Sequence, residues 1–455
     1  MTATTLSTTR PSAADLAAAT PASRERYVDL LRAVSILVVV LGHWLMAVIE
    51  RNDGEVQIGN VLAITPHSWL LTWLLQVMPI FFFVGGFSNA VAIESMRRKG
   101  RFSYGAWASS RANRLMRPVA VLLALWVPLI VVLELTPIGG ATLRSATTLV
   151  SQPLWFIGIY LIVCALAPLA HRAYRRFGSG SIVALGCVAA LVDVVRFALG
   201  LDGIGYCNFV FVWLFAQQLG FAYADGSLRR WGRASLVAMA VGGLTALALL
   251  VTVGPYPLSM VGMPGEKISN MAPPTVCLVA LTVWQVALVM LARDRVSAWL
   301  NRPRVWTATV VVNASIMTIF CWHLSAALAL TGGLLAVGAP FPTGGSLVWW
   351  LTRPLWIAVL TVLLLAFVAG FGRFERPSTS GSKRVPGNAV GVIGIIVLIV
   401  GVCGVAWGGL TPLFESKPLI LGVIGGGPAV TLGEVILGAA LLGLVPRLRI
   451  APATH

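Results

Sequence analysis

The chain has 455 residues, of which 58% are hydrophobic and only 11% charged, and its mean hydropathy is +0.87. About a quarter of the residues in a soluble domain are charged, so this composition excludes a soluble globular protein and indicates one embedded in lipid. The net charge of +17 lies in short clusters between apolar segments, which argues against nucleic acid as a partner. Lysine is scarce beside arginine and alanine, a bias typical of high-GC bacterial genomes, so we expect a bacterial plasma membrane.

Residues 1–25, rich in Thr, Ala, Ser and Pro, are predicted to form a disordered cytoplasmic tail. Twelve apolar segments long enough to cross about 30 Å of hydrocarbon follow, near 28–49, 68–93, 116–135, 152–170, 181–199, 204–224, 234–254, 272–292, 306–334, 347–371, 389–411 and 419–446. A linker at 376–388 and a tail at 447–455 flank the last two. The sequence therefore predicts an all-α polytopic membrane protein of about 12 transmembrane helices.

The positive charges predict the orientation of these segments. Of the 33 Lys and Arg residues, 26 fall on the side that holds the N-terminus, six fall on the opposite side, and Arg32 lies within the first segment. Cytoplasmic loops carry the excess of Lys and Arg in membrane proteins. Both termini are therefore predicted to be cytoplasmic.

The first apolar segment carries three ionisable side chains, Asp29, Arg32 and His43. At 100° per residue, Arg32 and His43 lie about 20° apart on one helix face, with Asp29 within about 60° of both. A rise of 1.5 Å per residue places His43 roughly 16 Å from Arg32, toward the outer half of the membrane. Ionisable groups within a span are costly, so each one is a candidate functional residue.

Two interpretations of this helix remain open. In the catalytic one, Arg32 binds a phosphate or a polar linker of a donor that enters from the cytoplasm. His43 then takes a proton from an acceptor hydroxyl or accepts an acyl group itself, with Asp29 as a third member of the site. In the structural one, His43 hydrogen-bonds a neighbouring helix, and Asp29 and Arg32 form an interfacial ion pair.

Five segments together resemble the acyltransferase-3 family of membrane O-acyltransferases. Arg32 and His43 match its Arg, ten residues, His motif, and residues 78–87 resemble its "FFxxSGF" block with Gly85 in place of the common serine. Arg111 and Arg114 match its RxxR motif. Residues 154–157 resemble its "LWF" block and 319–323 its "Y-x-x-H" block, with Phe320 or Cys321 replacing the tyrosine.

The resemblance covers residues 26–375, a ten-helix core, and leaves the helices of 389–446 outside it. It implies transfer of an acyl group, usually acetyl from cytoplasmic acetyl-CoA, to a hydroxyl of a glycan, lipid or small natural product. His43 then corresponds to the family's essential histidine. Acyl-CoA is a co-substrate, and no permanently bound cofactor or metal is expected. The acyl chain, the acceptor and the oligomeric state are left open. The alternative function is a lipid or glycan transporter or flippase, although no internal repeat between the two halves supports it.

Five further residues are candidates for binding. Arg111 and Arg114 are predicted to hold the phosphates of CoA, or else serve as topology charges that touch anionic lipid. His323 is predicted to orient the acceptor or to hydrogen-bond within the bundle. Trp155 and Asn208 are predicted to line a sugar or lipid pocket, although a tryptophan at the membrane interface is common without function.

Overall fold

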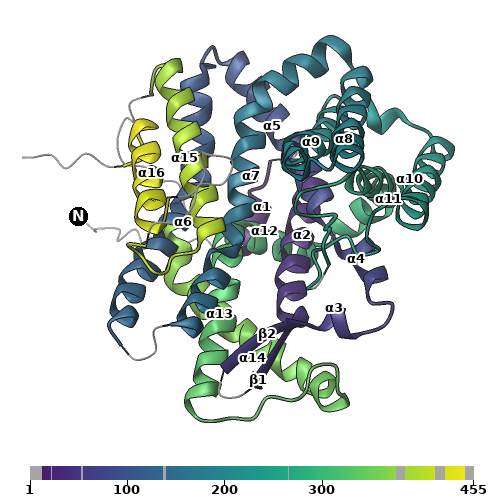
Figure 1. Ribbon diagram of the computed structural model, residues 1–455. Coiled ribbons are helices and arrows are strands. Elements are labelled where there is room, and N and C mark those ends of the chain that lie inside the picture. The colour runs from purple at the N-terminus through teal and green to yellow at the C-terminus, as the bar shows by residue number, and fades with distance from the viewer. Residues whose placement is uncertain are drawn as a thin grey trace, which may run out of the picture.

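The computed structural model describes residues 13–21, 23–52, 55–136, 140–264, 266–375, 385–415 and 426–445 as a helical bundle with one β-hairpin (Figure 1). Its helices are α1 (Ala13–Ala18), α2 (Arg26–Met46), α3 (Val61–Ile64), α4 (Trp69–Leu75), α5 (Met78–Arg98), α6 (Tyr104–Glu134), α7 (Ala141–Phe177), α8 (Ser179–Leu199), α9 (Asn208–Ala224), α10 (Arg233–Val253), α11 (Val276–Leu300), α12 (Pro303–Ala314), α13 (Ile316–Ala336), α14 (Leu347–Phe371), α15 (Asn388–Gly408) and α16 (Pro428–Leu441). Strands β1 (Ala47–Asn52) and β2 (Glu55–Asn60) form the hairpin.

Within these described residues, 11 helices are long and apolar enough to cross a membrane. The prediction of a multi-pass helical membrane protein is therefore confirmed. The twelfth predicted segment, 419–446, is only partly described. Its helix α16 has 14 residues, about 21 Å at 1.5 Å per residue, and it packs against α15. The predicted tail at 447–455 lies outside the described residues.

The two ends of the chain pack onto the bundle. Part of the predicted disordered tail forms α1, where Ala17 is buried and its carbonyl accepts a hydrogen bond from the Trp306 indole at 3.2 Å. At the other end, α15 packs against α6 and α7, and the figure shows α15 and α16 beside these helices. Gly105 permits this packing, since a Cβ there would lie 2.0 Å from the Pro386 carbonyl.

The first span is shorter than the predicted 28–49. Helix α2 ends at Met46, and the chain continues directly as β1, paired antiparallel with β2 from Ala47 opposite Asn60 to Asn52 opposite Glu55. Val48 and Ile49 are buried in this hairpin. β-Branched residues suit a pleated strand as well as an apolar helix, so hydropathy alone does not separate the two.

Helices α5 and α9 touch along their backbones. A Cβ on Gly86 would lie 2.0 Å from the Gln217 carbonyl oxygen, and one on Gly220 would lie 2.1 Å from that of Phe83. Small residues at such contacts let membrane helices approach closely, where dispersion contacts hold them together in the absence of a hydrophobic driving force. Helix α5 also packs against α2, so α9 supports α5 from one side while α2 contacts it from another.

The predicted span 306–334 is interrupted. Helix α12 ends at Ala314 and α13 begins at Ile316, with Ser315 between them outside helical geometry. The Glu375 carboxylate accepts hydrogen bonds from the backbone N–H groups of Met317 and Thr318, both at 3.0 Å. A helix that starts inside a bundle has free N–H groups, and a carboxylate at this positive end stabilises it. The short 3-10 helix Gly372–Glu375, which follows α14, therefore fixes the start of α13.

Candidate active site

The N-terminal part of α2 holds an ion pair between Asp29 and Arg32. Nη1 of Arg32 lies 2.9 Å from Oδ1 of Asp29, and Arg24 pairs with the other carboxylate oxygen. Nη2 of Arg32 donates to the Ser88 hydroxyl of α5 at 2.6 Å. The predicted shared face of Asp29 and Arg32 is confirmed. Asp29 lies 14 residues from His43, about 21 Å along the helix, so it acts on Arg32 and does not reach the His43 ring.

Three guanidinium groups gather near this ion pair. Arg111 and Arg114 of α6, together with Arg32, lie within electrostatic range of the Tyr160 hydroxyl on α7. The Arg111 guanidinium lies over the Trp107 ring, 4.4 Å from its centroid, and its buried Nε has no hydrogen-bond partner within the described part of the chain. Arg114 is exposed. The structure therefore brings together all three arginines that the sequence predicted for the donor.

Farther along α2, His43 contacts His323 of α13. Nδ1 of His43 lies 2.9 Å from Nε2 of His323, and the two ring planes are within 20° of each other. Nδ1 of His323 lies 2.6 Å from the Phe320 carbonyl oxygen, and the Trp44 indole donates to the His323 carbonyl at 3.0 Å. His323 is fully buried and His43 is half-buried. Two histidines that are 280 residues apart in sequence thus form one unit.

The hydrogen bonds determine which nitrogens carry protons. A carbonyl oxygen only accepts, so Nδ1 of His323 must donate to Phe320. With both rings neutral, Nε2 of His323 is an acceptor, and His43 donates to it through Nδ1. Nε2 of His43 then keeps a free lone pair and has no hydrogen-bond partner among the described residues. This nitrogen has the geometry of a base or a nucleophile.

Aromatic rings connect the arginines to the histidine pair. Tyr160 stacks on Phe156 with 5.7 Å between centroids, Phe156 meets Phe320 edge-on at 5.2 Å, and Phe320 lies 5.9 Å from His323. These rings come from α7 and α13 and fill the interior between the two polar groups. Phe156 and Phe320 are buried, and electrostatic interactions are stronger in such surroundings of low dielectric constant.

The remaining two candidates lie in other surroundings. Trp155 packs edge-on against Phe156, with 6.4 Å between centroids. Asn208 is fully buried and donates to Asp193 at 2.8 Å and to the Ala189 carbonyl at 3.2 Å. The same Asp193 accepts from the backbone N–H of Val276 at 2.7 Å, so Asn208 belongs to a network that ties α8 to the start of α11. Their predicted contact with substrate stays a prediction.

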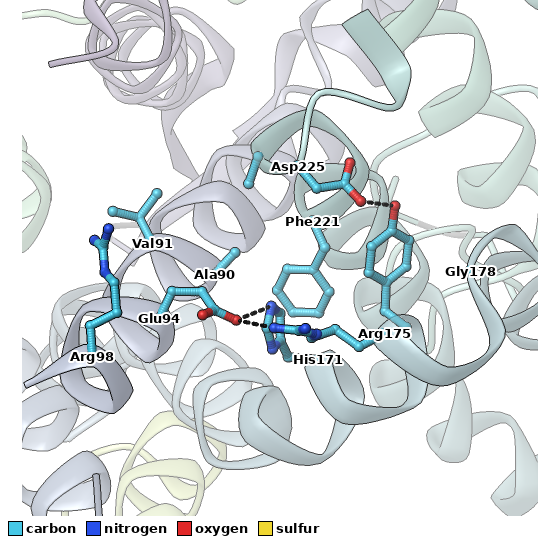
Figure 2. A pocket seen from close by; sticks show the side chains of 11 residues that line it. Ala90, Val91, Glu94, Arg98, His171, Arg175, Gly178, Phe221 and Asp225 are labelled. Carbon is cyan, nitrogen blue, oxygen red and sulfur yellow. Dashed lines mark hydrogen bonds and ion pairs between the residues drawn. The ribbon is translucent and has the colours of Figure 1, made fainter. Parts of the chain in front are cut away.

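A cavity of about 630 Å³ opens between the ends of α5, α7 and α9 (Figure 2). Glu94 lies at its wall, 3.0 Å from Arg175 and 3.7 Å from the buried His171 ring. Partial burial acts to raise the pKa of Asp225, yet hydrogen bonds from Ser227 and Tyr174 outweigh it and hold this pKa below its usual range. Neither Arg32 nor its partner Ser88 lines this cavity. It is therefore separate from the α2 site.

Sequence reasoning missed two residues of the site. Ser88 follows directly after the predicted 78–87 block, and Tyr160 lies six residues after the start of the 154–157 block. Tyr160 also explains Gly85, where a serine is common in the resembled motif. A Cβ on Gly85 would lie 3.0 Å from the Tyr160 ring, so a larger residue would crowd the phenol beside the arginines.

Most of the chain matches one known protein family. Residues 25–373 match a family model whose description is an acyltransferase domain. This range contains every candidate residue above and ends before α15 and α16. No curated protein and no solved structure matches the chain.

Proposed function

The chain belongs to the acyltransferase-3 family and is a multi-pass membrane acyltransferase, and from this we propose that it moves an acyl group, usually acetyl, from cytoplasmic acyl-CoA to an acceptor hydroxyl. The acceptor is a glycan, a glycolipid or another envelope or natural-product molecule. The observation that carries the proposal is the His43 ring, oriented through Nδ1 by His323 and open at Nε2. Arg32, on the same helix face, supplies the charge that a donor requires.

The donor binds at the arginine cluster. The phosphates of CoA pair with Arg111 and Arg114, while Arg32, held by Asp29 and Ser88, contacts the donor closer to the bundle interior. CoA is too polar to cross lipid whole, so only its thin thioester arm extends along the aromatic rings toward His43. The distance of about 16 Å from Arg32 to His43 along α2 sets the reach that this arm requires.

Two routes use the His43 lone pair. As a general base, Nε2 takes the proton of the acceptor hydroxyl while its oxygen attacks the thioester carbonyl. The carbon–sulfur bond breaks, and the CoA thiolate leaves with the proton from the imidazolium. As a nucleophile, Nε2 first forms an acyl-imidazole with release of CoA, and the acceptor oxygen then takes the acyl group. Both routes yield an ester and free CoA.

Purified protein in lipid nanodiscs, supplied with radiolabelled acetyl-CoA, tests this function. We expect free CoA to be released in step with label transferred to an envelope glycolipid extract from cells that lack the gene. A label on the protein that a later addition of extract discharges would identify the acyl-histidine route. A transporter or flippase would release no CoA and acylate nothing, and that result would refute the proposal.

The arginine cluster should govern use of the donor. Replacing Arg32, or Arg111 and Arg114 together, by alanine is expected to raise the KM for acetyl-CoA about 10–100-fold, because each lost hydrogen bond to a charged group is worth about 1.5–3 kcal/mol. Arg32→Lys should recover only part of the lost affinity for acetyl-CoA, because an ammonium cannot reproduce the planar guanidinium. Arg117→Ala, on the same helix, is the control. Unchanged donor KM in all three test variants would place the phosphates elsewhere.

The proposal also requires the donor and acceptor to approach from opposite sides. Single cysteines at Ser179, the first residue of α8, and at Thr343, between α13 and α14, suit a labelling test because both residues are exposed. The background needs all six native cysteines replaced. In intact cells we expect an impermeant thiol reagent to modify the cysteine at 343 and to spare that at 179 until the membrane is opened. Modification of both in intact cells would contradict the orientation.

A further inference from the structure

A small cavity of about 10 Å³ lies just beyond the His43 end of α2. It is lined by the start of β1, the connection between α13 and α14, and the first three turns of α14, and its lining includes Ala47, Ile49, Phe341, Trp349, Arg353 and Trp356. Ala47 is four residues after His43, about 6 Å farther along the chain. The charge pattern places this end of the bundle outside, opposite the arginine cluster for the donor.

The distinctive residue of this cavity is Arg353. Its side chain is 8% exposed, and its guanidinium lies over both the Trp349 and Trp356 rings, 4.3 and 4.9 Å from their centroids. Nε donates to the Trp349 carbonyl at 3.2 Å. No carboxylate pairs with Arg353 in the described part of the chain. The Trp356 indole N–H, also buried at this cavity, has no hydrogen-bond partner among the residues that the structure describes.

A buried cation without a counter-charge is costly, and such groups inside membrane proteins mark binding sites. The guanidinium lies over both tryptophan rings, and among the described residues only its Nε has a hydrogen-bond partner, which leaves the Nη N–H groups available to a ligand. That edge fits a carboxylate or phosphate through two parallel hydrogen bonds. The indole N–H of Trp356 supplies one more donor. The guanidinium and the indole N–H are both hydrogen-bond donors, as an anion requires.

Resting on the proposed function, we propose that this cavity binds an anionic group, carboxylate or phosphate, of the acceptor and so holds the acceptor hydroxyl toward His43. The present volume admits about one water molecule. An anionic group therefore has to displace part of the lining. Phe341 is the side chain expected to move, because it lies in the connection between α13 and α14, outside any helix or strand. The acceptor class is then an acidic glycan or a phosphate-bearing glycolipid.

The test uses the nanodisc protein, radiolabelled acetyl-CoA and the envelope extract as acceptor. We expect the labelled product to be retained on an anion exchanger, and phosphatase treatment or carboxyl reduction of the product to show which anion it carries. Arg353→Gln should raise the amount of extract needed for half-maximal rate about 10–100-fold while the KM for acetyl-CoA stays within twofold. Arg353→Lys should recover part of the loss. Inorganic phosphate should compete with the extract in the wild type and have less effect in Arg353→Gln.

Arg144→Gln removes an exposed positive charge on the same side and is the matched control, expected to behave as the wild type. Trp356→Phe keeps an aromatic ring and removes the N–H, and it should raise the amount of extract needed for half-maximal rate about tenfold. This variant provides the test if Arg353→Gln does not fold. A neutral labelled product, or wild-type half-saturation in both Arg353→Gln and Trp356→Phe, would overturn the anion site alone. Absence of any transfer by the wild type would overturn the proposed function as well.

Discussion

Replacing His43 by alanine is expected to lower the rate of acyl transfer by about 10²–10⁴, the usual loss when a general base is removed. If the histidine carries the acyl group, the loss is at least as large, because the covalent route disappears altogether. His43→Gln gives a closer comparison, since the amide preserves much of the side-chain volume and a polar contact with His323 but has no basic lone pair. The measurement is kcat for labelled acetyl transfer in nanodiscs.

Folding of these variants is checked by size-exclusion profile and by retained binding of acetyl-CoA at the arginine cluster, which lies about 16 Å away along α2. A well-folded His43→Gln protein with the turnover of the wild type would remove His43 from the chemistry. The histidine pair would then be an interhelical hydrogen bond that stabilises the contact between α2 and α13.

Replacing His323 by phenylalanine is expected to lower kcat by roughly 10²-fold, with the KM for acetyl-CoA unchanged. The ring fills the same space but cannot accept the proton of His43 Nδ1, so the tautomer that frees Nε2 is no longer selected. Loss of a group that orients a catalytic histidine typically costs between about 10- and 10⁴-fold. His323→Gln should recover part of the rate, because its amide oxygen accepts a hydrogen bond.

Cys321→Ala perturbs the same buried helix without touching the pair and serves as the control. If His323 were purely structural, His323→Phe and His323→Gln would each lose kcat only in proportion to the fraction of the protein that unfolds. Its role as a positioning residue instead predicts that the two variants differ in kcat while their stability in detergent is similar. Equal kcat for His323→Phe and the wild type, with His43→Gln inactive, would refute the positioning role and leave His43 in place.

Hydropathy and charge predicted most of the fold. The lipid requires long apolar helices, so their existence follows from composition and length. The exceptions are places where a contact with another segment determines the local backbone structure. Val48 and Ile49 continue the apolar pattern of α2 but lie in a strand, because Ala47–Asn52 has a pairing partner in β2. Ser315 interrupts an unbroken apolar run because Glu375, a residue from the end of the next helix, stabilises the new start.

Helix periodicity predicted the geometry of the site only within one helix, while the family resemblance added Arg111, Arg114 and His323 without their contacts. The 3.6-residue period places Asp29 and Arg32 on a common face, and their ion pair has that geometry. Nothing in the local sequence tells which helix packs beside α2, so the contact of His43 with His323 and that of Arg32 with Ser88 required the folded bundle. Arg353 appeared in the sequence only as one of the few outer positive charges. That no carboxylate among the described residues pairs with it depends on which side chains surround it in the bundle.

The pairing of His43 with His323 has a consequence for biogenesis. Ribosomes add about 5–20 residues per second, so the partner that is 280 residues downstream emerges roughly 15–60 s after His43 has left the exit tunnel. Throughout that interval the first helix resides in the bilayer with an unsatisfied imidazole, and the insertion machinery or early-arriving helices have to tolerate it. A nascent chain released before α13 is complete would be anchored in the membrane and catalytically silent. Separately expressed halves of the protein offer a way to time the assembly.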